Sequence, residues 1–221
     1  AFLGEDTKII GLTATPGRSV VNKEENQRLA DFFFQGIIEI NSGDLSVIDY
    51  LRNRKVLSYV ERKPLMTNRS FKLSASQIKH LEEKFDFPKG FIGTVGADDI
   101  RNLEIVKSLE GECHLGKKII FFACSVEHSK FVCALLTFLG FHAAHVDGST
   151  PSARRASVID GFKNGDVQVL CNFGVLSTGF DAPKTDVIFI SRPTASIVLY
   201  SQMVGRGLRG PVIGGTENCK L

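Results

Sequence analysis

From residue 117 onward, short runs of consecutive apolar residues alternate with stretches of helical character, and this rhythm constrains the fold more than any other feature. The predicted strands cover residues 119–123, 141–146, 167–171 and 187–190, and those at 119–123 and 187–190 are apolar throughout. A strand that is apolar on both faces is typical of a parallel sheet with a layer of helices on each side. We therefore predict an α/β fold with one parallel sheet over about residues 117–210.

The stretches between and before these strands predict the remaining elements. Helices are expected at 22–34, 44–54, 74–85, 98–109, 127–139, 151–162 and 195–204, and further strands at 8–13, 36–40 and 56–61. Ser74 or Ser76 is a plausible cap for the helix at 74–85. The run Phe87-Pro88-Lys89-Gly90 is expected to interrupt the helical pattern.

Small polar residues gather in the loops that follow three of the predicted strands. Ser125 follows the first strand, Gly148 lies in the run D-G-S-T after the second, and S-T-G-F-D-A-P occupies 177–183 after the third. The carboxyl ends of parallel strands lie at one edge of the sheet, which is where ligands bind in such folds. Hydroxyls, glycines and a carboxylate at that edge predict a ligand rich in phosphate.

Near the end of the chain, Gln202, Gly205, Arg206 and Arg209 spell Q-x-x-G-R-x-x-R. Two arginines three apart on a helix share a face, so both guanidiniums can reach one anion. Gly205 lowers helix stability but allows a ligand or another backbone to come close. The pattern suits a triphosphate, although a helix end with two solvated arginines would look the same.

Taken in order, these motifs resemble those of superfamily 2 helicases and translocases, and specifically the second RecA-like domain of that superfamily. T-A-T-P at 13–16 resembles motif III, and the run at 119–125 resembles motif IV. The segment 147–162 is similar to the H-G-x(6)-R element. T-G-F-D-A-P at 178–183 resembles motif V, and the segment 202–209 resembles motif VI. The resemblance covers residues 8–16 and 117–210. The wording S-R-P-T at 191–194 is similar to the branch with type I and III restriction translocases and repair helicases.

The resemblance implies a domain layout and a function. Residues 1–45 would be a remnant of the first RecA-like domain, 46–116 a linker and the leading segment of the second domain, and 117–221 the second, helicase C-terminal domain. The expected function is the C-terminal half of an ATP-dependent helicase or translocase, with nucleic acid as partner and DNA favoured over RNA.

The resemblance also implies roles at the nucleotide. Arg206 and Arg209 would be arginine fingers toward the ATP γ-phosphate, with Gln202 beside them. Asp181 could accept from the nucleotide ribose or orient the arginines, and it could equally be a turn residue. Gly179 and Gly205 would contribute to the same cofactor site.

On the nucleic-acid side, the expected phosphate contacts are Ser125, Gly148 and Thr178, although ordinary loop chemistry explains these residue types equally well. Arg155 could touch a phosphate, hold the motif V loop, or be a solvated helix residue. Motif V also departs from many relatives, because Phe173-Gly174 stands where they carry Thr-Asp.

Two parts of an ATP site are missing from the 221 residues. The one near match to a Walker A loop, at 111–118, ends in Lys118 where a Ser or Thr should bind Mg²⁺, and it precedes a strand instead of following one. We find no Asp-Glu-x-x box. We therefore expect ATP and Mg²⁺ to be bound mainly by a missing first RecA-like domain, which would be a partner of this one, and the chain alone to be inactive.

Composition limits the other possibilities. With 43% apolar residues, a net charge of +3 and no apolar run of 18 residues, the sequence predicts no membrane span, and we expect a cytoplasmic protein. Five scattered cysteines without C-x-x-C favour buried thiols over disulfides or metal ligands, and we expect no metal held by protein side chains alone. The alternative function is a non-catalytic RecA-like module that binds nucleic acid or a protein.

Overall fold

The computed structural model describes residues 23–33, 40–175, 182 and 184–221, and the chain divides into two compact units, Ala1–Val47 and Ile48–Leu221. In the first unit, helix α1 (Lys23–Phe32) lies within the expected helix at 22–34. The expected strand at 8–13 and the T-A-T-P run lie outside the described residues, as do residues 36–39 of the expected strand at 36–40. Helix α2 (Val47–Asn53) leads into the second unit.

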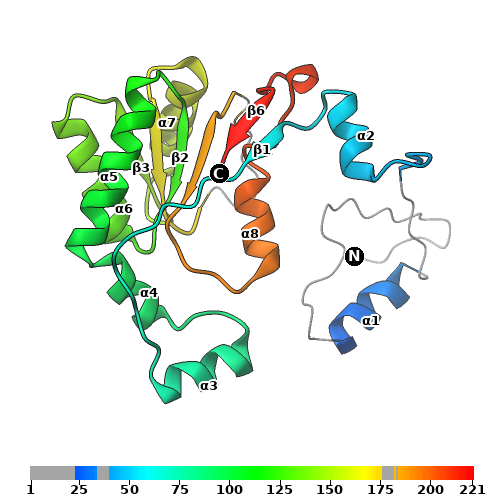
Figure 1. The fold of residues 1–221 in the computed structure, drawn as a ribbon, viewed down its shortest axis with the longest axis horizontal. Helices are drawn as coiled ribbons and strands as arrows, with labels where there is room; N and C mark the ends of the chain where they lie inside the picture. The colour runs from blue at the N-terminus through cyan, green and yellow to red at the C-terminus, as the bar shows by residue number, and fades with distance from the viewer. Residues whose placement is uncertain (1–22, 34–39, 176–181, 183) are drawn as a thin grey trace. The chain divides into compact units, whose positions relative to one another are not determined.

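The second unit contains a six-stranded sheet in which every pairing is parallel (Figure 1). Its strands are β1 (Tyr59–Glu61), β2 (Ile119–Phe122), β3 (Ala143–Val146), β4 (Val169–Asn172), β5 (Val187–Ile190) and β6 (Asn218–Lys220). Their order across the sheet is β1-β6-β5-β2-β4-β3. The predicted α/β fold with a parallel sheet is confirmed.

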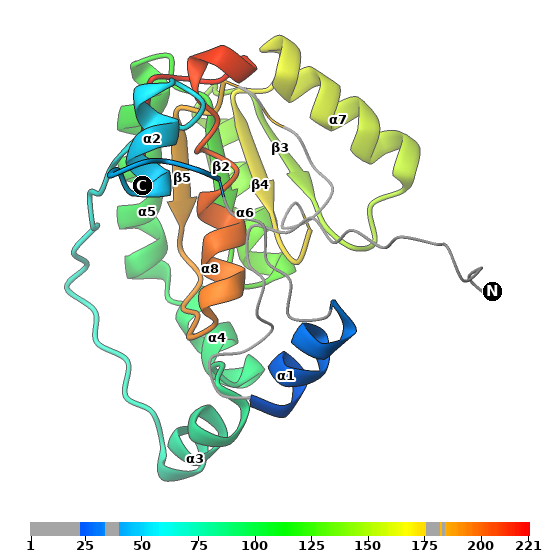
Figure 2. The ribbon, with the colours of Figure 1, turned by 90° about the vertical axis from the view of Figure 1, so that its right-hand side faces the viewer.

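Helices cover both faces of this sheet, whose central strands are apolar on both sides. Helices α5 (Asp99–His114) and α6 (Val126–Phe138) lie on one face, and α7 (Ser152–Asn164) and α8 (Ile197–Val204) lie on the other (Figure 2). Helices α3 (Ala75–Lys84) and α4 (Lys89–Gly96) lie beyond one end of the sheet (Figure 1). Ile119 and Phe121 of β2 pack with α5 and α6, whereas Ile120 and Phe122 pack with Phe162 of α7 and Met203 of α8. The alternation of side chains along one strand thus builds two cores.

Helix α4 and strand β6 were not expected from the sequence. Helix α4 begins inside the run that we read as a break, with Pro88 at its N-cap, and it buries Phe91, Ile92 and Val95. Its Gly96 is required by packing, since a Cβ there would lie 2.7 Å from Cβ of Cys124. The polar strand β6 was missed as well.

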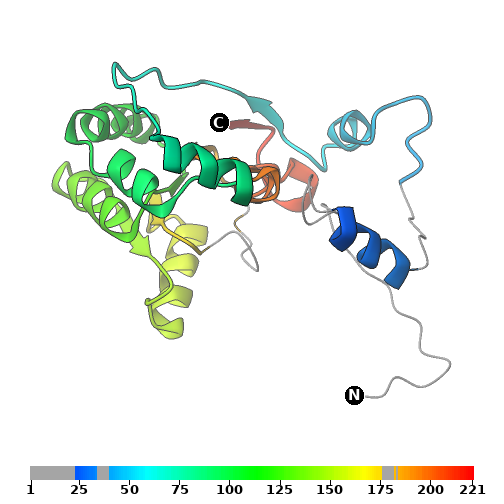
Figure 3. The same ribbon diagram turned by 90° about the horizontal axis from the view of Figure 1, so that it is seen from below.

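An extended segment joins β1 to α3 (Figure 3). At its end, Ser74 caps α3 and forms a capping box with Gln77.

The prediction that the two arginines share a helix face is wrong. Helix α8 ends at Val204, so Arg206 lies in the turn that follows it and Arg209 lies beyond, in an isolated bridge with Leu57. The physical reason is that the glycines admit other parts of the chain. A Cβ at Gly207 would lie 2.3 Å from Sγ of Cys219, and one at Gly210 would lie 2.2 Å from the backbone oxygen of Lys55.

Candidate functional site

The first predicted contact, Ser125, lies where β2 passes into α6. It is the N-cap of α6, and its Oγ accepts a hydrogen bond from the backbone N of His128 at 3.1 Å. Ser125 is half-buried, and it stands at the carboxyl end of β2. An N-capped helix start presents further backbone N–H groups and a partial positive charge, both of which favour an anion.

The second predicted contact, Gly148, lies in a loop whose backbone is hydrogen-bonded to the buried carboxylate of Asp147. Asp147 is 2% exposed, and its Oδ1 accepts from the backbone N of Ser149 at 2.8 Å and from that of Thr150 at 3.0 Å. Hydrogen bonds from the Ser149 hydroxyl and from His145 hold the pKa of Asp147 far below its usual range. Gly148 is exposed, and a Cβ added to it would meet nothing within 4 Å.

Arg155 braces this same loop from α7. Its Nη2 donates to the backbone oxygen of Asp147 at 2.9 Å and to that of Thr150 at 3.2 Å, and it lies 3.5 Å from that of Gly148. The structure thus shows Arg155 holding the loop after β3. The role expected for it was to hold the motif V loop, and most of that loop lies outside the described residues.

A pair of residues that we did not predict links the two loops. Oγ of Ser129, on α6, is hydrogen-bonded to Nδ1 of His145 at 2.7 Å, and Nε2 of His145 lies 3.0 Å from Oδ2 of Asp147. Ser129 is fully buried. The chain of contacts ties the start of α6 to the loop that carries Gly148. The spacing of His145 and Asp147, two residues apart where β3 ends, was the signal that could have revealed it.

The sheet order brings these loops together. Strands β2 and β3 both pair with β4 in parallel, so Ser125 and Gly148 lie at the same edge of the sheet, at the ends of strands separated by one neighbour. The loop that follows β4 begins between them at Phe173, and the guanidinium of Arg192 lies 5.9 Å from the Phe173 ring centroid. Thr178, Gly179 and Asp181 lie outside the described residues.

The residues of the arginine motif lie at the end of α8. Gln202 is half-buried in the last turn of the helix, and Gly205 is exposed at its C-cap. Arg206 and Arg209 are both half-buried. The backbone at Arg209 is held firmly, because its carbonyl oxygen accepts from the hydroxyl of Ser58 at 2.7 Å and from the backbone N of Thr216 at 2.9 Å.

Within the residues that the structure describes, no cluster of three or more His, Cys, Asp or Glu side chains has a geometry that could hold a metal ion. None of the helices described there combines the length and the apolar character that a membrane crossing requires.

Comparison with known proteins identifies the family. Residues 101–210 match the model of the helicase conserved C-terminal domain. A 51.5 kDa protein of a Lactococcus phage (isolate 7-9) is 30% identical over 204 residues, which make up 92% of this chain and 41% of the phage protein. The ATP-dependent rRNA helicase RRP3 of Lodderomyces elongisporus is 33% identical over 98 residues, 44% of this chain and 19% of that protein. The chain thus spans less than half the length of these relatives.

A solved structure extends the likeness over most of the chain. A fragment from Vibrio vulnificus YJ016, assigned to an HsdR subunit of a type I restriction enzyme, aligns with a TM-score of 0.62. It is 16% identical, and the match covers 90% of this chain and 37% of that one. At this level of identity the likeness shows the fold. The family match shows that the chain carries the helicase conserved C-terminal domain over residues 101–210, and the parallel α/β sheet is the fold expected for a RecA-like domain.

Proposed function

We propose that this chain is the second RecA-like half of an ATP-dependent DNA helicase or translocase. The observation that carries the proposal is that the capped start of α6 and the 147–150 loop lie at one edge of the sheet, within the domain that matches the helicase model. That edge is where parallel α/β sheets bind ligands. The preceding RecA-like domain would supply the rest of the ATP site.

On the nucleotide side, we assign Arg206 and Arg209 to the γ-phosphate of ATP, with Gln202 beside them. Guanidinium groups fit this ligand, since they present planar donors to phosphate oxygens and keep their charge. Gly205, and with it Gly179 and Asp181, would line the same cofactor site. Bound ATP supplies the free energy of phosphoryl transfer, while the arginines stabilise the charge that develops on the transferred group. We assign Mg²⁺ to the first domain.

On the nucleic-acid side, we assign the strand to the track formed by Ser125, Gly148 and Thr178. Exposed glycine backbone and the N–H groups of a helix start contact phosphates and not base edges, so binding should depend weakly on sequence and should fall with added salt. Arg155 would act by holding the 147–150 loop in place, because its guanidinium already donates to the backbone oxygens of Asp147 and Thr150.

The choice of DNA rests on the S-R-P-T wording at 191–194, which resembles the restriction and repair branch. The similarity to an rRNA helicase keeps RNA as the competing substrate. We also propose that the protein works in the cytoplasm, where the five free cysteines would remain reduced.

The test is ATP hydrolysis by the full-length protein without nucleic acid and with single-stranded DNA, duplex DNA or RNA of equal length. A DNA motor predicts that single-stranded or duplex DNA raises the rate several-fold and RNA does not. Binding of DNA without any hydrolysis would instead support the non-catalytic module. Stimulation by RNA alone would contradict the assignment to DNA.

A further inference from the structure

The carboxyl ends of four neighbouring strands lie at the edge of the sheet where the proposed nucleic-acid track runs. These strands are β5, β2, β4 and β3, in that order across the sheet. Ser125 follows β2 and Gly148 follows β3, so the track passes over the end of β4 between them. Arg192 follows β5, whose end lies directly beside that of β2.

The residues at the end of β4 carry no side chain that could bind a phosphate. The strand ends at Asn172, which is fully buried and whose Nδ2 donates to the backbone oxygen of Phe121 at 3.0 Å. Phe173 and Gly174 follow, and neither has a side-chain donor. A side-chain donor at this point of the track therefore has to come from a neighbouring strand end.

Arg192 brings its guanidinium to this point. Its Cζ lies 5.9 Å from the Phe173 ring centroid, and its side chain is 21% exposed. Contact with the ring holds the guanidinium without consuming its N–H donors. Nε of Arg192 is buried and has no hydrogen-bond partner among the described residues. Donor capacity thus remains beside Phe173.

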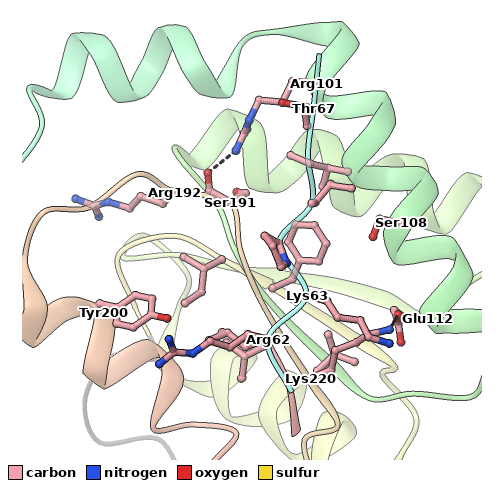
Figure 4. A pocket seen from close by; sticks show the side chains of 18 of the residues that line it. Arg62, Lys63, Thr67, Arg101, Ser108, Glu112, Ser191, Arg192, Tyr200 and Lys220 are labelled. Carbon is pink, nitrogen blue, oxygen red and sulfur yellow. Dashed lines mark hydrogen bonds and ion pairs between the residues drawn. The ribbon is translucent and has the colours of Figure 1, made fainter. Parts of the chain in front are cut away.

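The backbone that carries Arg192 is fixed from two sides. The backbone oxygen of Ser191 accepts a hydrogen bond from Nη2 of Arg101, on α5, at 2.6 Å (Figure 4). The backbone N and the hydroxyl of Ser191 both donate to the oxygen of Phe122, at 3.1 and 2.9 Å. From this fixed start, the Arg192 side chain extends away from Arg101 (Figure 4).

One carboxylate holds Arg192 loosely. Nη2 of Arg192 lies 3.5 Å from Oδ2 of Asp86, whose side chain is 33% exposed. The other oxygen of this carboxylate, Oδ1, accepts from the backbone N of Phe87 at 2.9 Å. An ion pair this open to water contributes little, so a phosphate can compete with Asp86 for the guanidinium.

We propose that Arg192 is a further nucleic-acid contact, which binds a backbone phosphate over the end of β4 and is held by Asp86 when no strand is bound. This inference rests on the proposed function, because it adds a residue to the same track. The ligand is a phosphodiester of the strand, since a guanidinium presents planar donors that fit phosphate oxygens.

Fluorescence anisotropy of a labelled 20-nucleotide oligodeoxythymidylate, titrated at low salt with the 221-residue chain, tests the proposal. Arg192→Ala should weaken binding by about ten-fold, as the loss of a charge-assisted hydrogen bond does. The slope of log affinity against log salt should become shallower by about 0.7, the value for one phosphate contact on a single strand. Arg154→Ala removes the same charge from an exposed position on α7 and should change affinity little.

Asp86→Asn provides the second test, because here the proposal predicts a gain. Asn keeps an acceptor for the backbone N of Phe87 but loses the charge, so the strand should bind about two- to five-fold tighter. The double variant Asp86→Asn/Arg192→Ala should bind no better than Arg192→Ala, since Asp86 acts through that guanidinium. A gain that persists in the double variant would come from net charge alone and would overturn the role of Asp86. Far-ultraviolet circular dichroism verifies that each variant folds.

One more variant separates this inference from the proposed function. Gly148→Glu places a carboxylate where an added Cβ meets nothing within 4 Å, and it should weaken binding if the track is correct. Weaker binding by Gly148→Glu with normal binding by Arg192→Ala would keep the track and overturn the contact at Arg192. The reverse result would support Arg192 and refute the contact at Gly148. Absence of binding by the unaltered chain, to this strand and to an RNA of equal length, would overturn both.

Discussion

At the scale of single residues, His128 is a buried imidazole that stays neutral. It is 2% exposed, and its Nδ1 accepts a hydrogen bond from the backbone N of Cys124 at 3.1 Å. Burial, and next the charge of Arg101, lower the pKa of His128 from 6.5 to about 4. Nδ1 of His128 can accept the hydrogen bond from Cys124 only while that nitrogen carries no proton. The protonation state of His128 therefore affects the turn between β2 and Ser125, which belongs to the candidate site.

The first prediction follows from that pKa. Between about pH 6.5 and pH 4 the unfolded chain binds a proton at His128 that the folded chain does not bind, so the stability present at neutral pH is lost as the pH falls. From pH 7 to pH 5 we expect a loss of about 2 kcal/mol from this group. His128→Asn keeps an acceptor but cannot titrate, and urea unfolding at the two pH values should show a smaller loss. Equal losses in both proteins would refute the assignment.

The second prediction concerns Arg155, whose guanidinium is hydrogen-bonded to the 147–150 loop. Arg155→Ala removes a guanidinium that donates to two backbone oxygens, and we expect it to lower the free energy of unfolding by about 1–3 kcal/mol. The neighbouring exposed Arg154→Ala removes the same charge without touching the loop, so it should cost little. If Arg155 also positions Gly148, its variant should weaken binding of a single strand more than Arg154→Ala does. Matched losses in both variants would mean that only net charge matters.

At the scale of elements, the turn after α8 is defined by close backbone approach. A Cβ at Gly210 would lie 2.2 Å from the backbone oxygen of Lys55. This overlap could be relieved only by moving the backbone, because neither atom belongs to a flexible side chain. We predict that Gly210→Ala lowers the free energy of unfolding by about 1–3 kcal/mol or more, as overpacking does. The control is Gly148→Ala, where the added methyl meets nothing within 4 Å. Chemical denaturation of the two variants compares them, and equal stabilities would contradict the packing shown here.

The elements also show where sequence reasoning reaches its limit. The apolar runs located β2, β4 and β5, because a strand buried on both faces must be apolar throughout. Strand β6 reads Asn-Cys-Lys, and its pairing with β1 and β5 comes from residues distant in sequence. Helix α4 contains three glycines, so packing against Cys124 had to override local propensity.

The candidate site also contains residues that the sequence predicted and contacts that it did not predict. Ser125 and Gly148 were recognisable because they follow apolar strands, and parallel topology places such positions at one edge. The link from Ser129 through His145 to Asp147 joins a helix to a strand end across the fold. The shared helix face proposed for Arg206 and Arg209 failed because α8 ends at Val204, and because Gly207 and Gly210 lie against parts of the chain distant in sequence.

At the scale of the whole molecule, we predict that the 221-residue chain alone releases no phosphate from ATP above background. Its sequence contains no Walker A loop and no Asp-Glu-x-x box to cradle the β-phosphate or to hold Mg²⁺. A phosphate-release assay on the isolated chain tests this prediction. Turnover that disappears in Arg206→Ala would reveal an ATP site within these residues and would refute it.

The central claim is that this domain supplies the arginines that act on ATP in a larger motor. Its most direct test is the turnover number of the full-length protein carrying Arg206→Ala or Arg209→Ala, measured with saturating nucleic acid, with ATP binding measured separately. We predict a fall of about 10³–10⁵-fold in kcat with ATP affinity largely retained, because arginine fingers act on the transition state. Lysine at either position should restore little, and the exposed Arg154→Ala should leave kcat unchanged. Near-normal turnover in both alanine variants would contradict the account.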